Sequence, residues 1–183
     1  MIFGKTIRLR AIEPTDLERF VEWFNDPEVT HHLMRFLPMS MQAEKDWFEK
    51  LQKHEEESRP LALDAREGDQ WVHIGSCGLH DVNWRIRRAE LGIAIGDKRY
   101  WNRGFGSDTV RTLLRHGFET LNLHRVYLYV FGDNERAIRI YSRQGFQEEG
   151  RLRDHSYRVG RYRDMIVMGI LRSEWEEMEE GKV

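Results

Sequence analysis

A pair of glycines, Gly104 and Gly106, stands where a predicted strand passes into a predicted helix. Without Cβ atoms, the backbone at these positions can come close to a ligand. The first turn of a helix carries unpaired N–H groups and a partial positive charge, so the two features together form an anion site suited to a pyrophosphate. Arg103 adds a positive charge beside this site. The predicted loop comprises Trp101, Asn102, Arg103, Gly104, Phe105, Gly106 and Ser107.

Two nucleotide-binding motifs with glycine-rich turns do not fit this segment. A dinucleotide-binding fingerprint requires a third glycine or an alanine at position 109, which is occupied by Thr109. A P-loop requires a lysine followed by serine or threonine after the last glycine, whereas the sequence continues with Ser107 and Asp108. A plain tight turn is the alternative that the glycine pair alone leaves open.

The elements that position this loop alternate between strands and helices along the chain. Helices are predicted to begin at Thr15, at Ser40, after Gly106 and at Asn134, the last of them ending before Gly145. The order β-α-α-β-β-β-α-β-α-β-β predicts an α/β fold of the mixed α+β kind, with helices on both faces of the sheet. Strands are predicted over residues 5–12, 60–66, 70–80, 90–95, 125–131, 146–152 and 165–171, with a hairpin connection over 83–88.

The first two helices have predicted boundaries and faces. Thr15 and Glu18 form a capping box, so the first helix is expected to start at Thr15. Pro27 disfavours helix at the residue before it and ends this helix, and residues 28–38 are expected to be irregular. The inner face of the second helix is expected to carry Ala43, Trp47 and Leu51.

The bulk composition bounds the class of protein. The 183 residues are 40% hydrophobic and 33% charged with a formal net charge of −2, which predicts one globular domain over residues 1–183 and no nucleic-acid or membrane partner. Cys77 is the single cysteine, which excludes an intrachain disulfide and a cysteine-built zinc site. This cysteine usage and the absence of an apolar N-terminal signal region predict a cytoplasmic protein. The neighbours His31 and His32 lack metal-ligand spacing, so no metal is predicted.

The loop and several further blocks carry a resemblance to a known family. The segment from Trp101 to Asp108 resembles the pyrophosphate loop of the GNAT superfamily of N-acetyltransferases, although Gln or Arg usually stands where this chain has Trp101. Residues 123–127, 133–138 and 141–146 resemble the strand and helix with which the family closes around acetyl-CoA. Residues 25–29 and 157–164 are similar to the branches that acetylate ribosomal-protein N-termini and spermidine. The resemblance implies a single-domain GNAT-like fold with a mixed, mostly antiparallel sheet of six to seven strands.

The resemblance also implies an enzyme that moves an acetyl group from the cosubstrate acetyl-CoA to a primary amine by direct attack in a ternary complex. Tyr141 is implied to protonate the departing coenzyme, since a phenol pKa near ~10 and a thiol pKa near ~8.5 permit that transfer. Glu90 is a candidate base for the amine, directly or through water, and a solvated charge at a strand end is its alternative. The backbone of residues 93–95 is implied to pair with pantetheine, with one N–H facing the thioester oxygen. Beyond the loop, the implied coenzyme-binding residues are Ile93, Ala94, Ile95, Asn134, Ala137 and Tyr141.

The acceptor is the least defined part of this interpretation. The segment between the first two helices, where the family binds acceptors, carries His31, His32, Arg35 and Phe36, and Trp84 lies in the hairpin before the coenzyme strand. An ordinary loop surface is the alternative for all five. A protein N-terminus, a polyamine and another small amine stay open as acceptors, and so does the oligomeric state, with a homodimer among the options. A non-catalytic acyl-CoA-binding or sensing module on the same fold is the alternative function.

Overall fold

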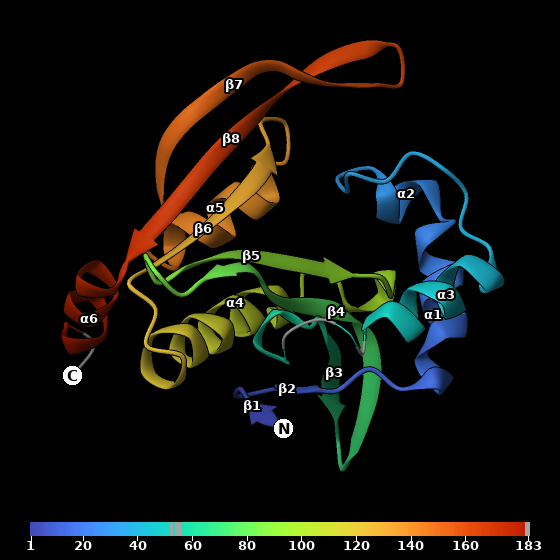
Figure 1. Cartoon of the computed structure of the whole chain (residues 1–183), viewed down its shortest axis with the longest axis horizontal. Helices are drawn as coiled ribbons and strands as arrows, with labels where there is room; N and C mark the ends of the chain where they lie inside the picture. The colour runs from blue at the N-terminus through green and yellow to red at the C-terminus, as the bar shows by residue number, and fades with distance from the viewer. Residues whose placement is uncertain (52, 54–55, 182–183) are drawn as a thin grey trace.

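A computed structural model describes residues 1–51, 53 and 56–181 (Figure 1). Its strands are β1 (Ile2–Phe3), β2 (Ile7–Arg10), β3 (Leu61–Glu67), β4 (Gln70–Asn83), β5 (Arg88–Ile95), β6 (Arg125–Phe131), β7 (Gln147–Arg158) and β8 (Arg161–Leu171). Its helices are α1 (Leu17–Phe24), α2 (Pro27–Thr30), α3 (Met41–Leu51), α4 (Phe105–Arg115), α5 (Glu135–Arg143) and α6 (Arg172–Glu180). All strands join one eight-stranded sheet in the order β1-β2-β3-β4-β5-β6-β8-β7. Neighbouring strands are antiparallel except β5 and β6, which are parallel.

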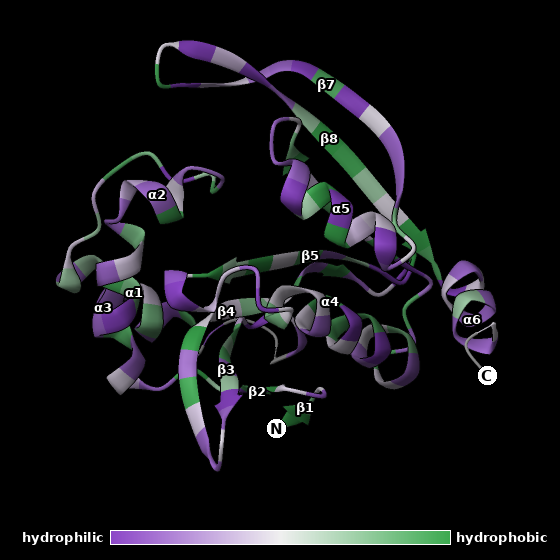
Figure 2. Ribbon diagram, turned by 180° about the vertical axis from the view of Figure 1, so that it is seen from behind, coloured by the Kyte–Doolittle hydropathy of each residue, from purple (hydrophilic) through white to green (hydrophobic). Residues whose placement is uncertain are grey.

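Two apolar cores form on opposite faces of the sheet, because consecutive residues of a strand point to opposite sides. Ala62 of β3 joins Phe20 and Trp23 of α1 in the smaller core. The next residue, Leu63, joins Val110 of α4 in the larger core. Helices therefore cover both faces, which confirms the predicted mixed fold, and the eighth strand is the short β1 at the edge. Figure 2 shows apolar residues along β8 and mainly hydrophilic ones along β7, the opposite edge of the sheet.

The start of the first helix differs from the prediction. A 3₁₀ turn, Pro14–Asp16, precedes α1, and the reciprocal cap is formed by Glu13 and Asp16 and not by a box at Thr15. The backbone N–H of Glu13 donates to Asp16 Oδ2 over 2.9 Å, and Arg10 donates two hydrogen bonds to the same carboxylate. The prediction was wrong because the partner that fixes Asp16 comes from β2, outside the local pattern.

The next two helices correct the prediction in part. The segment expected to be irregular begins with the helical turn α2. Ser40 caps α3 as expected, since its Oγ accepts from the N–H of Ala43 over 3.1 Å. The inner face was predicted correctly only at Leu51, which is buried; Ala43 and Trp47 are exposed, and Glu44 is buried instead. This helix has few apolar residues, so periodicity could not distinguish two faces that differ by about one position.

The last two strands form a hairpin that is longer than predicted. It turns at Val159 and Gly160, whose φ angles are 49° and 77°. Figure 1 shows its end reaching over toward α2. There the Arg158 guanidinium donates to the carbonyl oxygens of Thr30 and Leu33, over 2.5 and 2.6 Å. The arginine-rich segment predicted as a connection is therefore strand, and it holds the loop after α2.

Candidate functional site

The parallel strands β5 and β6 separate after a short contact. They pair only at residues 88–90 of β5 and 125–127 of β6. Beyond that point, β5 stays paired with β4 as far as Ile95, and β6 stays paired with β8 as far as Phe131. The facing edges of the two strands consequently lack a neighbouring strand, and a cleft of about 1300 Å³ opens between them. An extended ligand with amide groups can pair with such an edge as an added strand.

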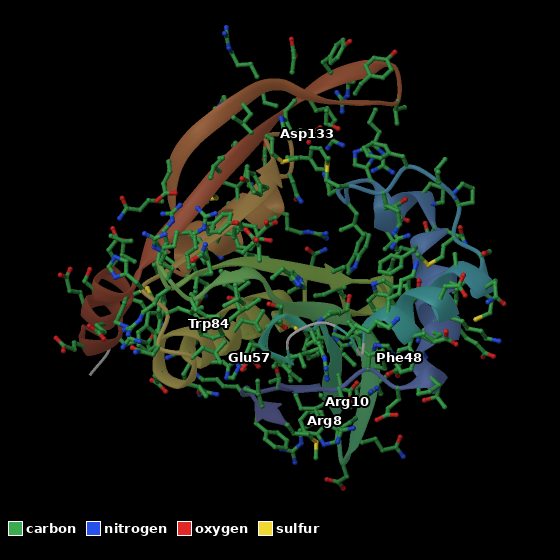
Figure 3. All side chains as sticks on the ribbon, viewed as in Figure 1. Arg8, Arg10, Phe48, Glu57, Trp84 and Asp133 are labelled. Carbon is green, nitrogen blue, oxygen red and sulfur yellow. The ribbon has the colours of Figure 1, made fainter. Side chains whose placement is uncertain are left out.

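Most of the predicted site residues line this one cleft. Three do not: Arg103, Trp84 and Phe36 are absent from its walls. Trp84 is 43% exposed in the β4–β5 turn, and Figure 3 shows it at the end of β5 that lies away from α2. The predicted residues that line the cleft are His31, His32, Arg35, Glu90, Ile93, Ala94, Ile95, Trp101, Asn102, Gly104, Phe105, Gly106, Ser107, Asn134, Ala137 and Tyr141.

The glycine loop presents the start of α4 to the cleft. Gly104 is the N-cap, with φ of 87°, a conformation that residues with a Cβ rarely adopt. A Cβ built on Gly104 would meet no atom within 4 Å, so the loop leaves open space beside the first N–H groups of the helix. The one acidic side chain of the first turn, Asp108, accepts hydrogen bonds from Lys5 and Thr6. This geometry is suited to a phosphate group at the helix N-terminus.

The position of Arg103 corrects the predicted source of positive charge. Its guanidinium lies over the rings of Tyr100 and Phe105 and pairs with Glu67 over 3.2 Å. Three arginines of α5 line the cleft instead: Arg136, Arg139 and Arg143. Their helical spacing was the signal available in the sequence, because residues three, four or seven apart share a helix face.

Trp101 connects the loop to both walls of the cleft. Its indole Nε1 donates to the carbonyl oxygen of Ile95 over 2.8 Å. The Arg136 guanidinium lies 4.7 Å from the indole ring centroid, a cation–π contact across to α5. The carbonyl of Ile95, one of the groups expected to be unpaired, is thus already bonded.

Helix α5 places Asn134 and Tyr141 on the same cleft. Asn134 is the N-cap, and its Oδ1 accepts from the N–H of Ala137 over 3.2 Å. Tyr141, one helical turn after Ala137, is buried beside Phe146, and the centroids of the two rings are 5.8 Å apart. Burial raises the pKa of the Tyr141 phenol to about 12, so the hydroxyl stays protonated at neutral pH.

On the other face of the sheet, Glu90 lies at the last position where β5 and β6 pair. Burial raises the pKa of its carboxyl, and the nearby Asp81 raises it further. Directly opposite Glu90 on β4 stands His80, which also lines the cleft and which the sequence interpretation did not single out. The alternation along β4 was the signal, since it places His80 on the face of Ser76 and Gly78.

A buried arginine holds the loop after α2, which carries His31 and His32, against β6 and β8. Arg163 of β8 donates to the carbonyl oxygen of His31 over 2.9 Å and also bonds Asp133, which Figure 3 labels at the end of β6. Its Nη2 lies 3.0 Å from His32 Nδ1, which must accept because arginine only donates. Burial and then the neighbouring His31 and Arg163 lower the pKa of His32 to about 4, so this imidazole is neutral. The 3.8 Å approach of His32 to Asp133 is accordingly no ion pair.

Comparison with known proteins identifies the family. Residues 6–147 match the family described as "Acetyltransferase (GNAT) domain". The chain belongs to the GNAT acetyltransferase family. It is 32% identical over 172 residues to a spermidine N(1)-acetyltransferase of Vibrio cholerae, covering 92% of this chain and 95% of that one. It is 29% identical over 177 residues to the uncharacterized N-acetyltransferase p20 of Bacillus licheniformis, covering 95% and 97%.

Solved structures agree with this assignment. The spermidine N-acetyltransferase from Vibrio cholerae in complex with CoA and spermine superposes with a TM-score of 0.85 at 28% identity, covering 94% of this chain and 99% of that one.

A relative from the second branch matches over a shorter stretch. Over 102 residues, or 56% of this chain and 55% of the relative, the chain is 34% identical to the putative ribosomal N-acetyltransferase YdaF of Bacillus subtilis. The family assignment makes this GNAT protein an N-acetyltransferase and confirms the resemblance to both branches.

Two negative observations apply to the part of the chain that the structure describes. No helix there is both long and apolar enough to cross a membrane. Within the same residues, no three His, Cys, Asp or Glu side chains are grouped as a metal site.

Proposed function

We propose that this GNAT enzyme transfers an acetyl group from acetyl-CoA to a primary amine by direct attack in a ternary complex. The observation that carries the proposal is a convergence on one cleft of three features: the unpaired edge of β5, the N-terminus of α4 and the phenol of Tyr141. The edge suits an amide-containing arm, the helix end suits a phosphate, and the phenol is a proton donor.

The walls of the cleft fit the two halves of coenzyme A separately. Pantetheine amides can pair with the β5 backbone near Ile93, and the pyrophosphate can use the open space beside Gly104. Arg139 and Arg143 add positive charge on the same cleft. The Vibrio cholerae relative that was solved with CoA and spermine supports both a coenzyme site and a small-amine acceptor on this fold.

Tyr141 is the proposed donor to the leaving sulfur. Its raised pKa keeps the phenol protonated until the carbon–sulfur bond breaks. The amine must lose a proton on the opposite face of the sheet, where Glu90 lies.

The test is coenzyme A release measured with a panel of primary amines, after acetyl-CoA binding has been demonstrated by calorimetry. Tyr141→Phe should bind acetyl-CoA as the wild type does and lose roughly 10²-fold in kcat, the size of a general-acid contribution. An unchanged kcat with a good amine would refute the acid role of Tyr141. Tight binding of acetyl-CoA without turnover of any amine would favour a binding or sensing module.

A further inference from the structure

We propose that His80 is the residue that takes the proton from the acceptor amine, an inference that rests on the acetyl transfer proposed above. His80 lies on β4 directly opposite Glu90, and both residues line the cleft. They stand where β5 leaves β6, next to the first residues of β5 that have no strand neighbour on the β6 side. An amine that attacks a thioester at this edge from the acceptor face would meet these two side chains first.

A pair of glycines fixes the position of the His80 ring. Gly78 and Gly92 stand opposite each other across the two strands, one step from His80 and Glu90 on the same face. A Cβ on Gly92 would lie 2.9 Å from His80 Nε2 and 3.0 Å from Cδ2, and a Cβ on Gly78 would lie 3.0 Å from Cε1. The imidazole therefore lies across both glycines, directed along the strands toward Ala94. Any other residue at either position would force the ring to turn.

The surroundings of His80 leave it neutral and oriented. The backbone of Ser58, in the helical turn before β3, hydrogen-bonds the ring, which fixes one nitrogen. Burial lowers the pKa of the imidazole despite that bond, so the neutral form predominates at neutral pH. The titratable group that faces it from β5 is Glu90, and no charged group contributes to its pKa shift. A neutral imidazole with one nitrogen bonded as a donor has its lone pair on the other nitrogen.

Glu90 is the competing acceptor, and the geometry favours His80 over it. Glu90 occupies the last position that pairs with β6, whereas the His80 ring extends over Gly92, beside the unpaired edge. Burial and Asp81 raise the pKa of Glu90, whereas burial lowers the pKa of His80, so the choice between the two residues rests on their positions. The residue whose side chain reaches the unpaired edge is within reach of the amine proton.

The proposed step moves two protons, one from the amine to His80 and one from Tyr141 to the coenzyme sulfur. The amine enters as the free base, having lost its extra proton to water, and its nitrogen lone pair forms the bond to the thioester carbon. As the carbon–sulfur bond breaks, one N–H proton passes to the free nitrogen of His80, and the Tyr141 proton passes to sulfur. Proton return through water from the imidazolium to the tyrosinate restores both residues. The products are the N-acetyl amine and the coenzyme thiol.

The experiment compares His80→Gln and Glu90→Gln over pH 5 to 9, with acetyl-CoA affinity measured in parallel. His80→Gln should lose roughly 10²-fold in kcat and lose the acidic limb of the kcat profile measured at saturating amine, with unchanged acetyl-CoA affinity. Glu90→Gln should keep that limb and fall less than about tenfold in kcat. Gly92→Ala keeps the histidine at position 80 but displaces its ring, so this variant should also lower kcat.

Two further measurements keep the outcome decisive if a variant is unstable. Added imidazole should restore part of the activity of His80→Gly, and NMR of the wild type should show His80 titrating below the ordinary 6.5. Full activity of His80→Gln, or loss of the acidic limb only in Glu90→Gln, would overturn the role of His80 and leave acetyl transfer intact. Absence of turnover in the wild type would overturn the proposed function itself, and the role of His80 with it.

Discussion

The indole N–H of Trp101 donates to the carbonyl oxygen of Ile95, the last residue of β5, over 2.8 Å. Trp101 opens the glycine loop, and Ile95 ends the strand that is proposed to pair with pantetheine. One hydrogen bond therefore sets the distance between the strand that would hold the arm of the coenzyme and the helix that would hold its phosphates. A second contact to the same indole ring comes from α5, where the Arg136 guanidinium lies over the ring.

Trp101→Phe should weaken acetyl-CoA binding about fivefold, because it removes the bond to Ile95, worth about 1 kcal/mol, and keeps a ring for Arg136. The measurement is the acetyl-CoA Kd by calorimetry. Trp84→Phe is the matched control, since Trp84 lies outside the cleft, and its Kd should equal that of the wild type. An unchanged Kd in Trp101→Phe would mean that the bond does not position the loop.

Gly104→Ala should lower both the stability and the coenzyme affinity. The φ of 87° costs a residue with a Cβ about 1 kcal/mol, and the new methyl occupies the space proposed for the pyrophosphate. Gly68→Ala is the control, because Gly68 in the β3–β4 turn has φ of 58° and equally open surroundings. Both variants should unfold at lower urea concentration, but only Gly104→Ala should raise the acetyl-CoA Kd. Equal affinities in the two variants would refute a phosphate site at this loop.

Arg163→Met should destabilise the protein by about 2 kcal/mol and raise the acceptor KM more than the acetyl-CoA KM. Arg163 is 5% exposed, and its guanidinium holds His31, His32 and Asp133 together. Arg161→Met removes the exposed partner of the same Asp133 and should cost less than about 0.5 kcal/mol. Chemical denaturation and initial rates measure the two effects. Equal losses in both variants would contradict a structural role of the buried bonds.

Acidification should destabilise the protein in the window from pH 6.5 to pH 4. His32 titrates near 6.5 when unfolded but at about 4 when folded, so in this window the unfolded state binds the extra proton. Stability is then present above pH 6.5 and is lost as the pH falls, by at most about 3 kcal/mol from this residue. The lowered pKa values of His73, His80 and His116 act in the same direction.

The variant His32→Asn isolates that contribution. Free energies of unfolding at pH 7, 5.5 and 4.5 should fall less steeply for the variant than for the wild type, because asparagine does not titrate. A slope equal to that of the wild type would show that His32 has the same pKa in the folded and unfolded states, and that its contact with Arg163 is not the one described.

The sequence predicted the features that depend on local pattern. Gly104 and Asn134 lie at the helix starts where backbone geometry requires them, and β6 has the predicted bounds. The wrong predictions for Arg103 and for the start of the first helix concern side chains that are held by residues of other strands. Arg103 is turned outward by Glu67, and Asp16 takes the cap because Arg10 from β2 holds it. Neither ion pair leaves a trace in the local sequence.

His80 illustrates the same limit for the site. Its importance comes from two glycines that stand opposite each other on different strands. This register belongs to the pairing of β4 with β5, which is regular from Gly75 to His80 and shifts only beyond His80. A shift of one residue in either strand would turn the ring to the other face. Such register is not encoded in any short motif, so the residue type alone could not identify it.

The short contact between β5 and β6 has a consequence for the mechanics of the molecule. Three residue pairs provide all the strand pairing between the β1–β5 block and the β6–β8–β7 block of the sheet. A coenzyme arm bound along the β5 edge would fill the gap between the blocks and stiffen the joint between them. We therefore expect the empty enzyme to flex about residues 88–90 and the loaded enzyme to resist that motion. Release of the thiol product would then restore the freedom that the next coenzyme needs to enter.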